Sequence, residues 1–148
     1  TSFEDKLAAS LVLTAYIPML MDTGGNSGSQ TSVTIIRGLS LDDIHFRDLF
    51  KVIWKELRVA ALCSITLAAC NFVKLLLLDR LTIPVAATIC CTLVVTVITA
   101  KLIGCILPMV AKKIGFDPAV MASPLITTIV DAVSLLVYFG FATLILHV

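Results

Sequence analysis

Four long apolar stretches constrain what this chain can fold into more than any other feature. Each reaches about 20 residues, the length that an α-helix needs to cross the hydrocarbon core of a bilayer. Backbone groups in lipid must be hydrogen-bonded within the chain, and no strand-period alternation is visible, so helices are favoured over a barrel. The sequence predicts an all-α integral membrane protein of one domain, with four transmembrane helices at about residues 7–37, 57–78, 82–110 and 119–146.

Composition supports lipid as the solvent for much of the chain. Charged residues make up 14% of the 148 residues, whereas about 25% is usual in a soluble domain. The net charge of +1 gives no argument for a nucleic-acid partner. The five cysteines lie in apolar runs without the paired spacing of zinc or redox sites, so we expect free thiols that pack as small apolar groups.

Basic residues divide the connections between the predicted helices into two kinds. The loops at about residues 38–56 and 111–118 are basic, whereas the turn at 78–82 has only Arg80, balanced by Asp79. Because positive charge marks the cytoplasmic side, we expect the two basic loops inside and the turn outside. Both ends of the chain then face outward, which predicts one further span upstream and an N-terminus that starts in the cytoplasm.

The first basic loop contains an amphipathic segment, "DDIHFRDLFKVIWKEL" at residues 42–57. Its apolar residues recur at helical spacing opposite charged ones. This pattern is typical of a helix that lies on the membrane surface, and equally of a cytoplasmic extension of the second predicted helix. Both interpretations stay open at this point.

The first apolar run is interrupted by the polar stretch "MDTGGNSGSQT", residues 21–31. Asp22, Asn26 and Gln30 recur every four residues, so a helix would place them on one face. The glycines between them allow another helix to approach closely, and Pro18 can loosen the helix and free a carbonyl for an ion or water. The alternative is a glycine-rich packing face whose polar side chains are bonded between helices.

Asp131 lies near the middle of the last apolar run, where a carboxylate costs about 2.5–3.5 kcal/mol on insertion scales. Thr127, Ser134 and Tyr138 follow the same helical seam, and such a polar stripe suits the wall of a pore. The alternative is a protonated Asp131 that bonds to a neighbouring helix. Lys101, in the third apolar run, is expected to be structural, reaching toward the interface or pairing with a carboxylate such as that of Asp131 or Asp22.

Facing walls of Asp, Asn, Gln, Thr and backbone carbonyls would form an all-oxygen ligand set. Such a set favours hard cations, and Mg²⁺ needs only one or two carboxylates because it keeps several of its waters. Soft metals would need Cys, Met or His on the same seam, where the sequence has none. Magnesium, calcium, manganese and sodium all remain open from this chemistry.

Two long motifs resemble those of a known family. "IPMLMDTGGNSGSQTSVTIIRGLS" (residues 17–40) and "FDPAVMASPLITTIVDAVSLLVYFGFA" (residues 116–142) are similar to the signature and last span of the MgtE magnesium channels and transporters. The resemblance covers essentially the whole chain. It implies a homodimer with five spans per subunit, of which this chain supplies the second to the fifth, and an ion path on the dimer axis between the second and fifth spans.

The resemblance also implies roles for particular residues. Asp131 matches the central Mg²⁺-binding aspartate, one from each subunit, and the backbone carbonyl of Thr127 is a second contact. Asn26 and Gln30 match polar positions of the second-span motif, and Asp22 joins the candidate metal ligands through its place on the same face. The family's cytoplasmic N-terminal and CBS domains, which regulate the pore, lie outside this chain.

These observations predict the pore domain of a dimeric magnesium channel, embedded in the lipid of a bacterial inner membrane, and not an enzyme. Hydrated Mg²⁺ would be the transported ion and would pass Asp131. The first alternative is a cation exchanger driven by protons or sodium, with Asp131 titrating during the cycle. More remote alternatives are an intramembrane hydrolase with Asp22 and Asp131 as an acid pair, and a scaffold subunit without an ion path.

Overall fold

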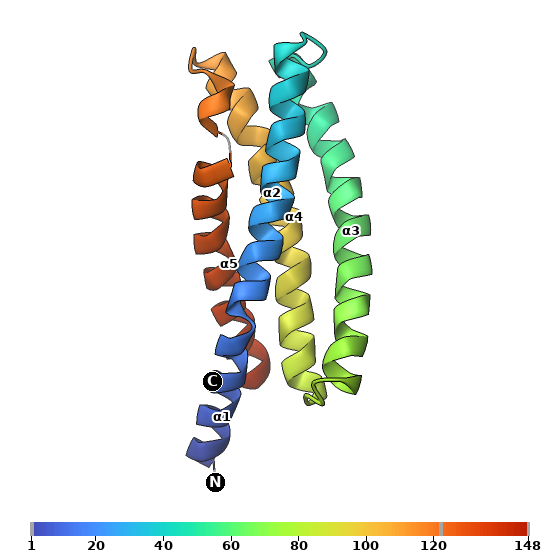
Figure 1. The fold of residues 1–148 in the computed structure, drawn as a ribbon, viewed down its shortest axis with the longest axis vertical. Helices are drawn as coiled ribbons and strands as arrows, with labels where there is room; N and C mark the ends of the chain where they lie inside the picture. The colour runs from blue at the N-terminus through green and yellow to red at the C-terminus, as the bar shows by residue number, and fades with distance from the viewer. Residues whose placement is uncertain (1, 122, 148) are drawn as a thin grey trace.

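A computed structural model describes residues 2–121 and 123–147 of the chain and shows a bundle of helices (Figure 1). The helices are α1 (Ser2–Ala15), α2 (Ile17–Ser40), α3 (Leu49–Leu77), α4 (Ile83–Lys113) and α5 (Ser123–Leu146). Two short 3₁₀ helices, η1 (Phe46–Asp48) and η2 (Pro118–Met121), precede α3 and α5. The expectation of an all-α fold is confirmed.

Three helical segments of the described residues are long and apolar enough to cross a membrane, at Phe46–Leu77, Ile83–Lys113 and Pro124–Leu146. The sequence predicts four. The remaining predicted span corresponds to α1 and α2, which are separated at Tyr16. Pro18, near the start of α2, has no N–H to bond to the preceding turn, and the polar stretch at residues 21–31 lowers the hydropathy of α2. The span count of four therefore stays a prediction.

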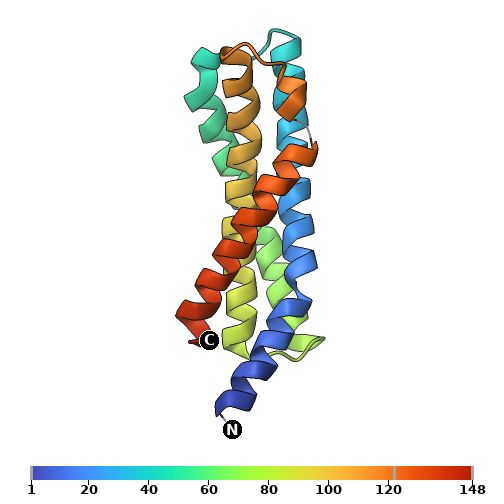
Figure 2. The same ribbon diagram turned by 90° about the vertical axis from the view of Figure 1, so that its left-hand side faces the viewer.

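Helix α4 forms the centre of the bundle, and α2, α3 and α5 all pack against it. Over an 18-residue apolar stretch of α4, 56% of the residues are buried, against 22% over the corresponding stretches of α3 and α5. The two outer helices thus leave large apolar side chains uncovered, among them Leu62 and Ile65 on α3 and Leu136 on α5. Figure 2 shows α5 slanting across α4 and α2 and leaving one side of α2 open.

The connections gather at the two ends of the bundle as the charge pattern predicts. The loop between α2 and α3 and the connection from α4 to α5 lie at one end, and the turn between α3 and α4 lies at the other (Figure 1). Which end faces the cytoplasm stays a prediction. The structure decides between the two interpretations of the amphipathic segment, because α3 begins at Leu49 and runs without a break to Leu77. The segment is mostly an extension of this helix and not a separate one.

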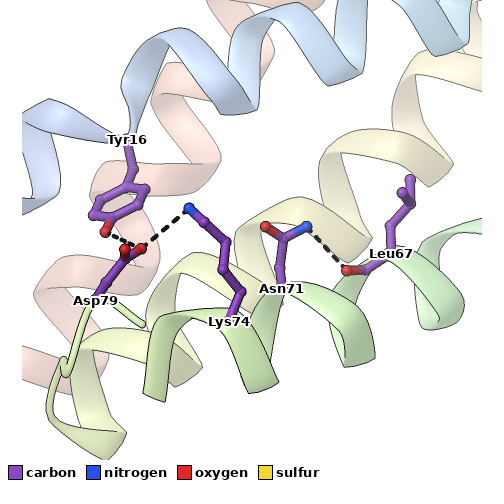
Figure 3. A network of polar contacts seen from close by, with 5 residues as sticks. All are labelled: Tyr16, Leu67, Asn71, Lys74 and Asp79. Carbon is purple, nitrogen blue, oxygen red and sulfur yellow. Dashed lines mark hydrogen bonds and ion pairs between the residues drawn. The ribbon is translucent and has the colours of Figure 1, made fainter. Parts of the chain in front are cut away.

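A polar cluster ties the junction of α1 and α2 to the turn between α3 and α4 (Figure 3). The Tyr16 hydroxyl donates to Asp79 Oδ2 at 2.7 Å, and Lys74 Nζ donates to the same oxygen at 3.1 Å. The bond from Tyr16, together with the bond and charge of Lys74, lowers the pKa of Asp79 below its ordinary value. From α5, the Tyr138 hydroxyl donates to the Leu13 carbonyl at 2.7 Å, so the junction is held from two sides.

Candidate cation site between α2 and α5

The glycines of the polar stretch form the packing face of α2. Gly24, Gly25 and Gly28 are all buried. A β-carbon on Gly25 would lie 3.2 Å from Thr127 Cγ2, and one on Gly24 would lie 2.9 Å from Val130 Cγ1. On the α4 side, a β-carbon on Gly104 would clash with the Gly28 carbonyl. The absence of side chains therefore lets α2 lie close to both α4 and α5.

The polar side chains of the same stretch point the other way. Asp22, Asn26 and Gln30 are exposed on the described chain. A groove opens beside them between α2 and α5, and its lining residues are Met21, Asp22, Gly25, Asn26, Thr127 and Asp131.

The structure thus brings four of the five predicted site residues together, two from each helix. Gln30 lies further along the exposed face of α2 and is outside the groove lining. Its backbone carbonyl accepts a hydrogen bond from Thr34 Oγ1 at 3.0 Å.

The two carboxylates of the groove differ in their hydrogen bonding. Asp22 Oδ2 accepts a hydrogen bond from Asn26 Nδ2 at 3.2 Å. Asp131 Oδ1 is buried and has no hydrogen-bond partner among the described residues. Buried polar atoms are almost always paired, because leaving one unpaired costs about 1–3 kcal/mol. An unpaired carboxylate oxygen that lies beside an open groove has the chemistry to accept a cation or the waters around one.

The remaining members of the polar stripe on α5 do not line the groove. Ser134 and Tyr138 are each only 2% exposed, and both donate to backbone carbonyls. Thr96 Oγ1 is another buried oxygen without a partner among the described residues, but it belongs to α4, on the Gly24 side of α2. Of the polar stripe on α5, only Thr127 and Asp131 therefore line the groove.

A separate cluster of buried polar side chains joins α2 to α3 and α4. Lys101 Nζ donates to Thr31 Oγ1 at 3.2 Å, and this hydroxyl donates to Glu56 Oε2 at 3.3 Å. Lys101 is 9% exposed and Glu56 8%. The hydrogen bond of Lys101 thus leads to Thr31 and Glu56 and to neither carboxylate of the groove.

Sequence reasoning missed Glu56, which it placed among the charges of an exposed face. The signal that could have found it is its spacing on α3, because Glu56, Ala60 and Ser64 recur every four residues and are all buried. Small residues at this spacing are typical of a helix-packing face.

The groove does not form a complete metal site within one chain. Among the described residues there is no group of three or more His, Cys, Asp or Glu side chains that could hold a metal ion. What it offers are two carboxylates, the Asn26 amide and the Thr127 hydroxyl. This set suits a hard cation that keeps most of its water shell.

Long apolar helices with uncovered apolar side chains define the class of this molecule as a helical membrane protein, with a carboxylate-lined groove between two of its helices. The model of the MgtE family, described as divalent cation transporters, matches residues 17–141, which is most of the chain. The chain belongs to the MgtE family, and magnesium transport is the activity for which its relatives are named.

Three relatives are similar over nearly the whole chain, and each is named magnesium transporter MgtE. The protein of Thermus thermophilus is 37% identical over 146 residues, and that of Bacillus subtilis 32% over 149 residues; each alignment covers 98% of this chain. The protein of Enterococcus faecalis is 26% identical over 144 residues, 97% of this chain. The chain spans 32% of the length of each of these relatives.

Proposed function

We propose that this chain is the pore domain of a magnesium channel and that hydrated Mg²⁺ moves along the groove between α2 and α5. The observation that carries the proposal is the buried Asp131 Oδ1, unpaired among the described residues and next to an open polar groove. Membership of the MgtE family and the names of the relatives support magnesium as the cargo.

Asp131 and its neighbours would bind the ion through its water shell. Mg²⁺ gives up its waters reluctantly and is usually held by one or two carboxylates. Asp131 would supply the charge, and the Thr127 carbonyl and the Asn26 amide oxygen would accept hydrogen bonds from the bound waters. Binding of this indirect kind is weak enough to allow release, which conduction requires.

A second copy of the chain would complete the path. The groove opens on the outside of the bundle, where Asp22 and Asn26 are exposed. Exposed carboxylates are costly in lipid, so another protein surface or water must face them. A twofold axis beside the groove would place two Asp131 side chains around one ion and close the pore. The upstream span and the regulatory domains predicted from the sequence complete this proposal of an inner-membrane channel.

The test is the flux of Mg²⁺ into liposomes that contain the full-length protein with Asp131→Asn. We expect flux to fall by on the order of tenfold or more, since each tenfold corresponds to only about 1.4 kcal/mol of lost ion stabilisation. Asp43→Asn is the matched control, because Asp43 is exposed in the loop after α2 and away from the groove. Unchanged flux in Asp131→Asn would refute the site.

The same liposomes separate a channel from a coupled exchanger. A channel carries Mg²⁺ down its own gradient, whereas an exchanger requires a proton or sodium gradient or dissipates one. We expect Mg²⁺ flux that is unaffected when both gradients are removed. Flux that stops without them would replace the channel proposal by the exchanger.

A further inference from the structure

The N-terminal part of α3, together with Arg47 in η1, carries exposed aromatic and basic side chains on one face. Phe50 is 82% exposed and Trp54 60%. The "α3 basic patch" consists of these two residues and four exposed cations, Arg47, Lys51, Lys55 and Arg58. Steps of three and four residues connect its members, so in a helix they share one face. The Arg58 guanidinium lies 5.9 Å from the centroid of the Trp54 ring.

The four cations of the patch outnumber the two acidic residues of the same stretch, Asp48 and Glu56. Of the two acidic residues in this stretch, Glu56 is buried on the opposite face with Thr31, and Asp48 Oδ2 accepts a hydrogen bond from the His45 N–H at 3.1 Å. Within the described parts of the chain, none of the four cations forms an ion pair with a carboxylate. The patch therefore presents a net positive charge to whatever faces it.

The length of α3 places the patch at the level of lipid headgroups. The helix has 29 residues, or about 43 Å at 1.5 Å per residue, whereas the hydrocarbon core is about 30 Å thick. The exposed apolar side chains Leu62, Ile65 and Leu77 mark the part that faces lipid tails. The first turns of α3 then extend beyond the hydrocarbon, with Trp54 at the boundary where aromatic rings are enriched.

We propose that the α3 basic patch binds the phosphate groups of anionic phospholipids, with Phe50 and Trp54 inserted at the boundary of the acyl chains. Charge complementarity selects the ligand, because clustered Lys and Arg beside a transmembrane helix attract anionic lipid. The aromatic rings select lipid over a soluble partner, because they continue the lipid-facing apolar surface of the same helix. This inference rests on α3 spanning the membrane and does not rest on the proposed ion path.

Trp54 provides a direct probe, because it is the only tryptophan in the 148 residues. The full-length protein, with any tryptophan outside these residues replaced by phenylalanine, is reconstituted in vesicles of equal parts phosphatidylglycerol and phosphatidylcholine. Bromine atoms on the acyl chains of one lipid or the other then quench the Trp54 emission on contact. We expect quenching by brominated phosphatidylglycerol to exceed that by brominated phosphatidylcholine by about twofold or more.

Two charge-matched double variants locate the effect. Lys51→Gln/Lys55→Gln removes two cations of the patch and should bring the quenching ratio close to one. Arg37→Gln/Arg80→Gln removes two exposed cations elsewhere and should leave the ratio as in the wild type. Circular dichroism confirms that each variant is folded. A wild-type ratio near one, an undiminished ratio in Lys51→Gln/Lys55→Gln, or an equal loss in both variants would overturn the proposal.

Discussion

Gly28 is a residue at which α2 packs closely against both α4 and α5. A β-carbon there would lie 2.9 Å from Ile126 Cγ2 and 3.1 Å from the carbonyl oxygen of Ala100. The Ile126 side chain can rotate away from such a β-carbon. The Ala100 carbonyl cannot, because it belongs to the backbone of α4. Gly140 on α5 is a useful contrast, because a β-carbon there would have no neighbour within 4 Å among the described residues.

Gly28→Ala should therefore lower the free energy of unfolding, by about 1–3 kcal/mol, the usual cost of overpacking a core. Gly140→Ala should be neutral or stabilise the protein by up to about 1 kcal/mol, because alanine favours the helical backbone. Denaturant titration in detergent, followed by circular dichroism, measures both. Equal effects of the two changes would contradict the close packing of α2.

At the scale of elements, local spacing predicted which face of α2 is polar, because the helical period depends only on the local backbone. The same rule failed for Ser134 and Tyr138, which share the seam of Asp131 but are covered by the preceding helices. Their burial depends on how α5 slants across α2, which no local pattern encodes. The separation of α1 from α2 and the inward side chain of Glu56 depend in the same way on tertiary packing.

The buried group of Lys101, Thr31 and Glu56 joins α4, α2 and α3, and a cycle of variants tests its contribution. Glu56→Gln or Lys101→Met alone should each lower the free energy of unfolding by about 3 kcal/mol, because each leaves one buried charge uncompensated. The double variant should cost less than the sum, with a coupling of about 0.5–3 kcal/mol.

Lys55→Met is the control for this cycle, since Lys55 is exposed and has no carboxylate partner among the described residues. It should change the free energy of unfolding by less than about 0.5 kcal/mol. Strict additivity of Glu56→Gln and Lys101→Met would show that the two charges act independently.

At the scale of the whole molecule, the position of the groove determines what surrounds it. A groove buried within one bundle would need no partner, whereas this one opens to the outside with Asp22 and Asn26 exposed. The lipid-facing side of α3 is a different surface, on which Leu62 is 72% exposed and apolar. We therefore expect a second copy of the chain to contact the groove side and not the exposed apolar side of α3.

Thiol crosslinking in the membrane measures this difference. In a background without the five native cysteines, Asn26→Cys should form covalent dimers with a short thiol-to-thiol crosslinker, because a residue beside a twofold axis meets its own copy. Leu62→Cys, on the surface that faces lipid, should remain monomeric under the same conditions. Added Mg²⁺ should slow crosslinking at position 26 if the ion occupies the space between the copies. Equal crosslinking at both positions would contradict a twofold axis beside the groove. It would also contradict a closed pore that contains two Asp131 side chains.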